Sequence, residues 1–470
     1  MKPAPPARVF PFMDDLAAPH RNSQRSRYPV RVPLGRRPLG VVGSALVARR
    51  NVLELIPEIA VRQPMVSGHT GKRWHMVMDP DALRIVLKDK VDDYPKSLVT
   101  QLILEPAIGQ SLFVAEGAHW RWQRRAAAPA FAQRNVEALA PVMTAAAEAS
   151  RRRLAAATRA VDVFAETVAA TFEVISDVTF SGDEGFDRDA VHHAIDAYIS
   201  STARLSVLDI LGLPGWIPRP GRLGSGRDLR RMKKVADDAI RARALAGPRP
   251  VPDLLDLLRA GEDPETHRAM SPGELRDNLL TFIVAGHETT ALTLAWALYL
   301  LAFDPEVQDR AAIEARTVLG ARAASAADVP RLTYIRQIVE ETLRLYPPAA
   351  FLSRTSRIHD RLGGREVRPG DTVMMPVYAL HRHHLLWDDP DRFDPGRFAP
   401  GVQRDRFAFL PFGAGPRICI GASFALQEAV IILATLVAGL RFELTPREPE
   451  PRMILTLRPQ GGVWLRVSAR

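Results

Sequence analysis

The chain contains a single cysteine, and the residues around it are those of a reactive thiol. Cys419 ends the segment Phe412-Gly-Ala-Gly-Pro-Arg-Ile-Cys and precedes an apolar stretch with the pattern of a helix. The N-terminus of a helix offers free backbone N–H groups and a positive dipole end, and both stabilise a thiolate. Gly421 would leave room for a large planar group, and Arg417 is placed to meet an anion. The pattern favours a stabilised thiolate, although for an isolated Cys a buried structural cysteine would be the preferred interpretation.

A second polar group lies in the middle of a long apolar helix predicted from 271 to 303. Its sequence is Ala285-Gly-His-Glu-Thr-Thr. A Thr hydroxyl can bond to the carbonyl one turn earlier and bend the helix, which would open space for dioxygen and water. The acid–alcohol pair Glu288 and Thr289 could then pass protons to bound oxygen. The alternative is a kink whose polar groups are satisfied internally, and His287 is expected to pack or to face solvent.

Weaker signals accompany these two segments. Glu341 and Arg344 lie at i and i+3, where they can pair, and Trp120 and Arg124 lie one helical turn apart. Taken alone, each pair also fits an ordinary solvated helix face. Three histidines between 381 and 384 suggest a metal site, but no carboxylate or cysteine has the ligand spacing that would support it.

Taken together, the motifs resemble those of the cytochrome P450 family. The cysteine segment fits FGxGxRxCxG and the helix centre fits [AG]Gx[DE]T[TS] at every fixed position. Glu341 and Arg344 resemble the ExxR element, and the segment 393–398 resembles the PERF element, with Gly396 where the family often has Glu. The resemblance covers about residues 70 to 465, in the family's order. It implies a structural ion network of Glu341, Arg344 and Arg397.

The resemblance also implies heme b as the cofactor, with Cys419 as the iron ligand. A thiolate donates electron density to heme iron in a way that favours O–O cleavage. Thr289 and Glu288 would deliver protons. Phe412 would pack near the sulfur, Ala285 would face the distal pocket, and basic and aromatic side chains would reach the propionates. The implied cofactor-binding residues are Trp120, Arg124, Ala285, Arg354, Phe412, Arg417, Cys419 and Gly421.

The reaction implied is insertion of one atom of dioxygen into a hydrophobic small molecule, such as a fatty acid or a terpenoid. Pocket positions implied by the family are Ala285, Ala349 and residues near 102–113. Electrons would come indirectly from NAD(P)H through a ferredoxin or flavodoxin and its reductase, which could dock on Arg121, Arg124 and Arg125. A peroxide-driven peroxygenase of the same family and a non-catalytic heme sensor are the alternatives.

The composition is consistent with a soluble enzyme. The formal net charge is +10, mostly from Arg, and no nucleic-acid motif is present, so an acidic protein partner is favoured over nucleic acid. One cysteine excludes an intramolecular disulfide, and no signal peptide is visible. The apolar run 279–303 has a polar centre, which favours a buried helix over a membrane span. We therefore expect a cytoplasmic protein without a membrane span.

The elements that would position these residues form a mainly α fold with small β-sheets. We expect an irregular segment 1–27 and a single large domain 28–470. Strand 74–78 should lead into a helix after Asp79-Pro80, and a Ser-Pro-Gly-Glu start opens the long helix. Further helices are expected within 117–245, broken near 182–185 and 213–226, at 306–319 and 331–345, and from about Cys419. A β-rich region is expected at 351–380 with a type II turn at 368–371, and a hairpin of 453–457 with 463–467.

Overall fold

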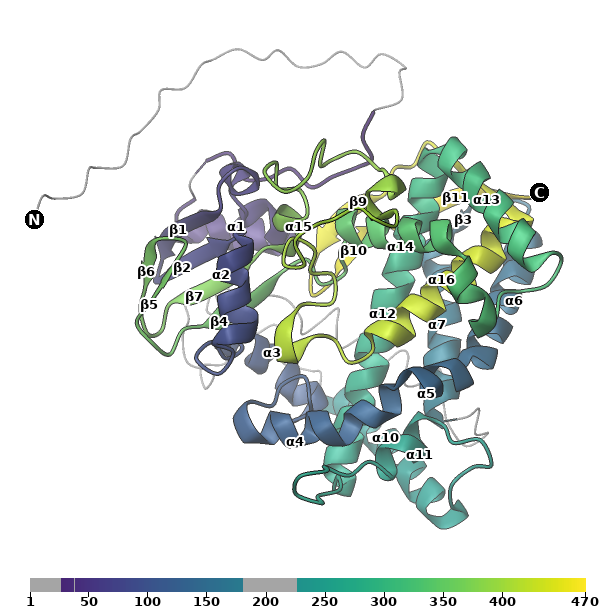
Figure 1. Cartoon of the computed structure of the whole chain (residues 1–470), viewed down its shortest axis with the longest axis horizontal. Coiled ribbons are helices and arrows are strands. Elements are labelled where there is room, and N and C mark those ends of the chain that lie inside the picture. The colour runs from purple at the N-terminus through teal and green to yellow at the C-terminus, as the bar shows by residue number, and fades with distance from the viewer. Residues whose placement is uncertain (1–26, 38, 181–225) are drawn as a thin grey trace, which may run out of the picture.

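The computed structural model describes residues 27–37, 39–180 and 226–470. A β-rich lobe lies beside a larger helical body, and the long helix α12 runs through that body (Figure 1). The breaks predicted between 182 and 225 lie outside the described residues. The fold is mainly helical with small sheets, as the residue patterns predict.

The long helix α12 spans Pro272–Phe303, in agreement with its predicted limits. The Ser271 side chain accepts a bond from the Glu274 N–H, while the Glu274 carboxylate accepts one from the Ser271 N–H, so the capping box fixes its start. It packs against α7 (Val163–Phe180) and α16 (Ala422–Gly439). A Cβ on Gly286 would lie 3.1 Å from Ile175 Cδ1, so this glycine permits the close approach of α7.

The helices around α12 follow the predicted order. α13 spans Pro305–Leu319 and α14 spans Thr333–Leu345. Asp304 ends α12 and caps α13 by accepting the Val307 N–H, which is why the two helices follow without a linker. The other helices are α1 Val41–Arg50, α2 Pro80–Arg84, α3 Leu98–Ile108, α4 Gly117–Ala127, α5 Gln133–Ala138, α6 Ala140–Ala155, α10 Gly226–Ala246, α11 Leu254–Arg259 and α15 Val377–Leu380.

The β-rich lobe is built on a four-stranded sheet of order β1-β2-β7-β4. β2 and β7 are parallel, and the other two pairs are antiparallel. Gly370 has φ +87° and the Asp371 N–H donates to the Arg368 carbonyl at 3.0 Å, so the predicted turn forms before β7. The strands of this lobe are β1 Met65–Thr70, β2 Lys72–Val77, β4 Leu352–Thr355, β5 Asp360–Leu362, β6 Arg365–Val367 and β7 Thr372–Met375.

The predicted C-terminal hairpin is wrong. β9 (Glu450–Met453) pairs with β10 (Leu457–Gln460), whereas β11 (Trp464–Ala469) lies between β3 (Val161–Asp162) and β8 (Leu440–Leu444). The Gly461-Gly462 pair does turn the chain, but it directs β11 to distant strands. Two partner strands satisfy both edges of β11, which one local partner could not do.

Among the described residues, one helix is long and apolar enough to cross a membrane. This is α16, and 61% of that stretch is buried inside the molecule. α16 packs against α6, α12, α13 and α14, so here it is a core helix.

Candidate active site

The cysteine loop joins a short 3-10 turn, Gly415–Arg417, to α16. Cys419 lies three residues before the helix, and its N–H donates to the Phe412 carbonyl at 2.9 Å. Gly415 has φ +70°, and a Cβ there would lie 2.0 Å from the carbonyl oxygen of Leu87. Leu87 belongs to the π-helical turn Ile85–Asp89, so the loop rests directly on that turn's backbone and only glycine fits.

The Cys419 side chain is accessible to solvent, but many protein atoms surround it and affect its acidity. Burial raises the pKa of Cys419 above its ordinary value, against the opposing effects of the Gly421 N–H and the Arg124 charge. The N–H at the helix end therefore favours the thiolate, as expected, while desolvation opposes it. The cation beside the sulfur is Arg124 rather than Arg417. Arg124 supplies positive charge that favours a thiolate here, and a coordinated metal would supply more.

The polar centre of α12 makes the backbone bonds that were predicted. Thr289 Oγ1 donates to the Ala285 carbonyl at 2.8 Å, and Thr290 Oγ1 donates to the Gly286 carbonyl. The helix nevertheless runs unbroken through this segment. Ala285 is exposed, whereas most of the helix is buried, so its methyl group faces an open site. His287 is buried edge-on against Phe172, which confirms its packing role.

Glu288 is hydrogen-bonded to the β9–β10 hairpin rather than to Thr289. Its Oε1 accepts a bond from Thr456 Oγ1 at 2.5 Å and one from Arg458 Nε at 2.5 Å. The carboxylate is buried, so this charge-assisted pair is a strong restraint on its orientation. Thr456 and Arg458 were not predicted, because no local signal links them to a residue about 170 positions away.

A cluster of cations surrounds the cysteine loop. Arg354 on β4 is buried, its Nε has no hydrogen-bond partner, and burial lowers its pKa to about 10. Arg417 pairs with Glu116 and lies over the Trp120 ring at 4.3 Å. Burial also lowers the pKa of Arg124. Trp120, Arg124, Arg354 and Arg417 thus lie around one region next to Cys419, and Glu116 is a partner that sequence reasoning missed.

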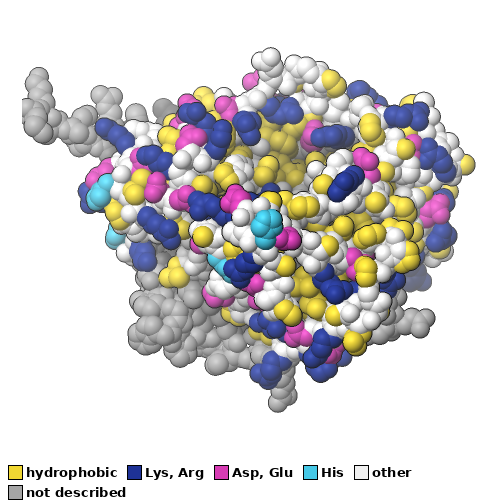
Figure 2. Space-filling view, turned by 60° about the horizontal axis from the view of Figure 1, so that its bottom comes forward, with side chains coloured by type: hydrophobic (Ala, Val, Ile, Leu, Met, Phe, Trp, Pro, Cys, Tyr) yellow, Lys and Arg dark blue, Asp and Glu magenta, His cyan; other side chains and the backbone are white. Residues whose placement is uncertain are grey.

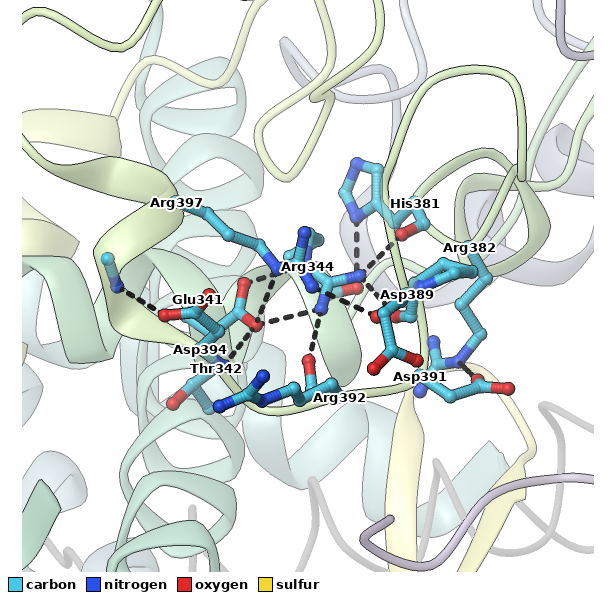
Figure 3. Close-up of polar contacts among 12 residues, drawn as sticks. Glu341, Thr342, Arg344, His381, Arg382, Asp389, Asp391, Arg392, Asp394 and Arg397 are labelled. Carbon is cyan, nitrogen blue, oxygen red and sulfur yellow. Dashed lines mark hydrogen bonds and ion pairs between the residues drawn. The ribbon is translucent and has the colours of Figure 1, made fainter. Parts of the chain in front are cut away.

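The Glu341–Arg344 pair at the centre of the ion network behind the loop is fully buried, and Arg397 is largely buried. Arg344 makes two bonds to the Glu341 carboxylate, 2.6 and 2.8 Å, and donates to the carbonyls of His381, Pro390 and Arg392 (Figure 3). Arg397 Nε lies 3.6 Å from Glu341 Oε1. These bonds hold the segment 389–397 that leads toward the cysteine loop. Gly396 still fits there, since its N–H donates to the Asp394 carboxylate.

Of the three histidines near 381, His381 belongs to this network. His381 Nδ1 bonds with the Arg344 carbonyl, and Nε2 accepts the Leu410 N–H. Burial lowers the pKa of His381 to about 3, so the ring is neutral. Within the described part of the chain, no group of three metal-ligating side chains is present.

The predicted docking arginines are largely engaged elsewhere. Arg125 pairs with buried Asp263 at 2.5 Å, and the charge of Arg124 acts on Cys419, so both have partners within the protein. Arg121 is partly exposed and pairs with Asp92. Lys88 was missed by sequence reasoning: it is exposed, and its Cα lies 3.1 Å from where a Cβ on Gly415 would be.

The residues of this site suit a planar, dianionic, iron-bearing ring. The accessible thiol of Cys419 supplies an axial ligand, and the exposed Ala285 on the long helix supplies an apolar face. The buried arginines lack a full set of anionic partners and supply groups that bind carboxylates. Gly421 leaves space as well, since a Cβ there would meet only Phe131, at 3.9 Å. This donor set fits heme with a thiolate ligand.

Comparison with known proteins identifies the class. Residues 33–466 match the family model of cytochrome P450, and the chain belongs to that family. It is 32% identical to cyclooctatin synthase of Streptomyces melanosporofaciens, over 90% of this chain and 93% of the relative. It is equally identical to cyclooctat-9-en-7-ol 5-monooxygenase of the same organism, over 92% of each chain. The crystal structure of the cytochrome P450DA heme domain matches with a TM-score of 0.76 and 26% identity, covering 87% of this chain and 90% of that one. The chain is a P450 monooxygenase and, as a member of the family, a heme-iron oxidoreductase.

Proposed function

We propose that the enzyme hydroxylates a hydrophobic small molecule, with Cys419 as the heme ligand and a separate protein as the electron donor. The observation that carries the proposal is the exposed thiol of Cys419 near Arg124. The loop that bears this thiol can rest on residues 85–89 because position 415 is a glycine. Heme, when bound there, supplies the binding and reduction of dioxygen.

The residues of α12 have separate tasks in this proposal. Thr289 Oγ1 donates to the Ala285 carbonyl in this structure, and by rotating away from it the hydroxyl would donate its proton toward the open site beside Ala285. Glu288 must leave Thr456 and Arg458 before it can accept or pass a proton on the Thr289 side. The exposed Ala285 methyl group makes the adjoining wall apolar.

The substrate class rests on this apolar wall and on the relatives. Phe113 is 41% exposed and its ring lies against Lys96, while the side chains of Leu102 and Ile103 are outside those described. The name of one relative specifies oxygenation of an alkenyl alcohol at a ring carbon. A terpenoid-like substrate fits both observations, whereas a fatty acid fits the apolar wall alone. Electrons would come from NAD(P)H through a ferredoxin or flavodoxin and its reductase.

The first experiment tests thiolate ligation. The purified protein is reduced and treated with carbon monoxide, and its Soret band is recorded. We expect a strongly red-shifted band that is lost in Cys419→Ser. A band typical of histidine-ligated heme, or no heme at all, would contradict the assignment.

A second experiment separates a monooxygenase from a peroxygenase or a heme sensor. NADH consumption is measured with a surrogate ferredoxin, its reductase and candidate substrates. In Thr289→Ala we expect electron use to continue while product formation falls, since the proton donor is gone. Unchanged coupling would remove the role assigned to the hydroxyl, and turnover only with peroxide would favour the peroxygenase.

A further inference from the structure

The helix α1 exposes its larger apolar side chains and buries its smaller ones. Ser44, Ala45 and Ala48 are buried against the protein, whereas Val42 is 74% exposed and Leu46 is 62% exposed. A surface helix normally turns its large apolar residues toward the core and its polar residues toward water. The two exposed residues therefore add little to the core, and folding does not explain them.

The exposed apolar residues of α1 form one continuous patch. Val42 and Leu46 are four residues apart, so they lie on the same face of the helix. Leu39 extends this face before the helix begins: it is 39% exposed, and a Cβ on Gly43 would lie 3.5 Å from its Cδ2. Exposed apolar residues that are scattered singly are normal, but a cluster is typical of an interaction site. We call Leu39, Val42 and Leu46 the α1 patch.

The surroundings of the α1 patch are basic. The segment 36–62 contains five arginines, two glutamates and no other charged residue, so its formal net charge is +3. Both glutamates are already paired, with Arg36 and Arg50. Arg37 and Arg49 are exposed and have no acidic partner among the described residues. Arg49 follows the α1 patch on the same face of the helix.

An apolar patch bordered by unpaired arginines suits the surface of an anionic bilayer. Apolar side chains of a helix enter the boundary between headgroups and acyl chains, while arginines beside them bind the lipid phosphates. A stable protein partner needs about 800 Å² on each side and is typically anchored by aromatic side chains. Three aliphatic side chains do not supply that area, and the segment 36–62 has no aromatic residue. The charge and the chemistry of this face therefore favour lipid over protein.

We propose that α1 docks the protein reversibly on an anionic bilayer, with the α1 patch in the headgroup region and Arg37 and Arg49 against the lipid phosphates. The overall charge of +10 adds long-range attraction to such a surface but does not select a face of the molecule. The α1 patch makes that selection. Docking through α1 does not depend on the proposed reaction.

The test is co-sedimentation of the holoprotein with vesicles of phosphatidylcholine, alone or mixed with phosphatidylglycerol. We expect binding to the mixed vesicles at low salt, weaker binding to phosphatidylcholine alone, and weaker binding to both at about 1 M salt, where the Debye length is about 3 Å. Leu46→Glu should reduce binding about tenfold or more, since a charge replaces a buried apolar side chain. Ile313→Glu makes the same change at a residue 67% exposed on α13, on the opposite side of the molecule (Figure 1), and should reduce binding much less.

The arginines are tested by removing one charge at a time. Arg49→Gln should weaken binding to the mixed vesicles about fivefold, because an arginine near an anionic surface contributes about 1 kcal/mol. Arg134→Gln removes an exposed arginine on α5 and is the matched control, with binding expected near that of wild type. All variants change exposed side chains, so their melting temperatures should equal that of wild type.

Three results would overturn docking through α1. The first is a wild-type protein that does not bind the mixed vesicles at low salt. The second is an equal loss of binding in Leu46→Glu and Ile313→Glu, which would mean that net charge alone governs the attraction. The third is a dimer, detected by analytical ultracentrifugation, that Leu46→Glu abolishes, since the α1 patch would then be covered by a second copy of the chain.

Discussion

At the scale of single residues, Glu428 is the group with the clearest consequence for pH dependence. It lies on α16, fully buried, with Oε1 unpartnered and the Thr290 side chain as a hydrogen-bond partner. Burial raises the pKa of Glu428 from 4.5 to about 8. The folded protein therefore holds this proton at neutral pH, and the unfolded chain releases it.

The sign of the effect on stability follows from proton linkage. Because the folded pKa is the higher one, the stabilising contribution is complete below about 4.5 and is lost as pH rises through about 8. Each pKa unit corresponds to about 1.36 kcal/mol, so the loss is at most roughly 5 kcal/mol. The side chain of Glu428→Gln cannot ionise, so this variant should not lose stability in this way. We expect the melting temperature of the variant, relative to wild type, to rise between pH 5 and pH 8.5; a difference independent of pH would contradict this.

Residue roles were predictable from sequence where the chemistry is local. Cys419 and Thr289 lie in compact motifs, and the structure gives each the environment that its neighbours suggest. The partners of buried charges were not predictable. Glu116 and Arg458 lie far along the chain from Arg417 and Glu288, and only the fold brings them together. The desolvation of Cys419 was not predictable for a related reason, since it depends on all the residues around the thiol.

At the scale of elements, the cysteine loop depends on one close backbone contact. A side chain at Gly415 would lie 2.0 Å from the Leu87 carbonyl oxygen, whereas one at Gly413 would meet nothing within 4 Å. Both glycines have positive φ, +70° and +72°, so the two positions share the same backbone strain. Gly413→Ala is thus a matched control for Gly415→Ala.

The two variants should differ in heme content. Gly413→Ala adds only the left-handed backbone penalty of about 1–2 kcal/mol, and we expect most of the thiolate-ligated heme to remain. Gly415→Ala must also displace the loop from residues 85–89, so the red-shifted carbonyl band should fall at least several-fold per mole of protein. Equal heme content in both variants would mean that the contact with Leu87 does not set the position of Cys419.

Elements were predictable where their ends carry local signals. The Ser271–Glu274 capping box set the start of α12, and the Pro-Gly pair set the turn before β7. β11 was mispaired because the Gly461-Gly462 turn indicates a reversal but not the partner. β11 pairs with β3, about 300 residues earlier in the sequence, and with β8, about 20 residues earlier. Local sequence patterns do not encode these pairings.

At the scale of the whole molecule, electrostatics bears on electron delivery. The chain carries a formal net charge of +10, yet Lys and Arg are scattered among apolar and acidic side chains over the face shown in Figure 2. Two of the three predicted docking arginines also serve the protein itself, because Arg125 pairs with Asp263 and the charge of Arg124 acts on Cys419. Attraction of an acidic carrier would thus come from the overall charge together with positions such as Lys88, which is exposed beside the cysteine loop.

The rate of reduction by a ferredoxin tests this in two ways. Long-range steering weakens as the Debye length falls from about 30 Å at 0.01 M salt to about 8 Å at 0.15 M. We expect the second-order rate of reduction, followed by stopped flow, to drop about tenfold over that range. Lys88→Glu should lower the low-salt rate more than Lys72→Glu, because both change the net charge equally and only Lys88 lies beside the loop. A rate that does not depend on salt would show that charge does not steer the carrier, and equal effects of the two variants would place its docking site away from Cys419.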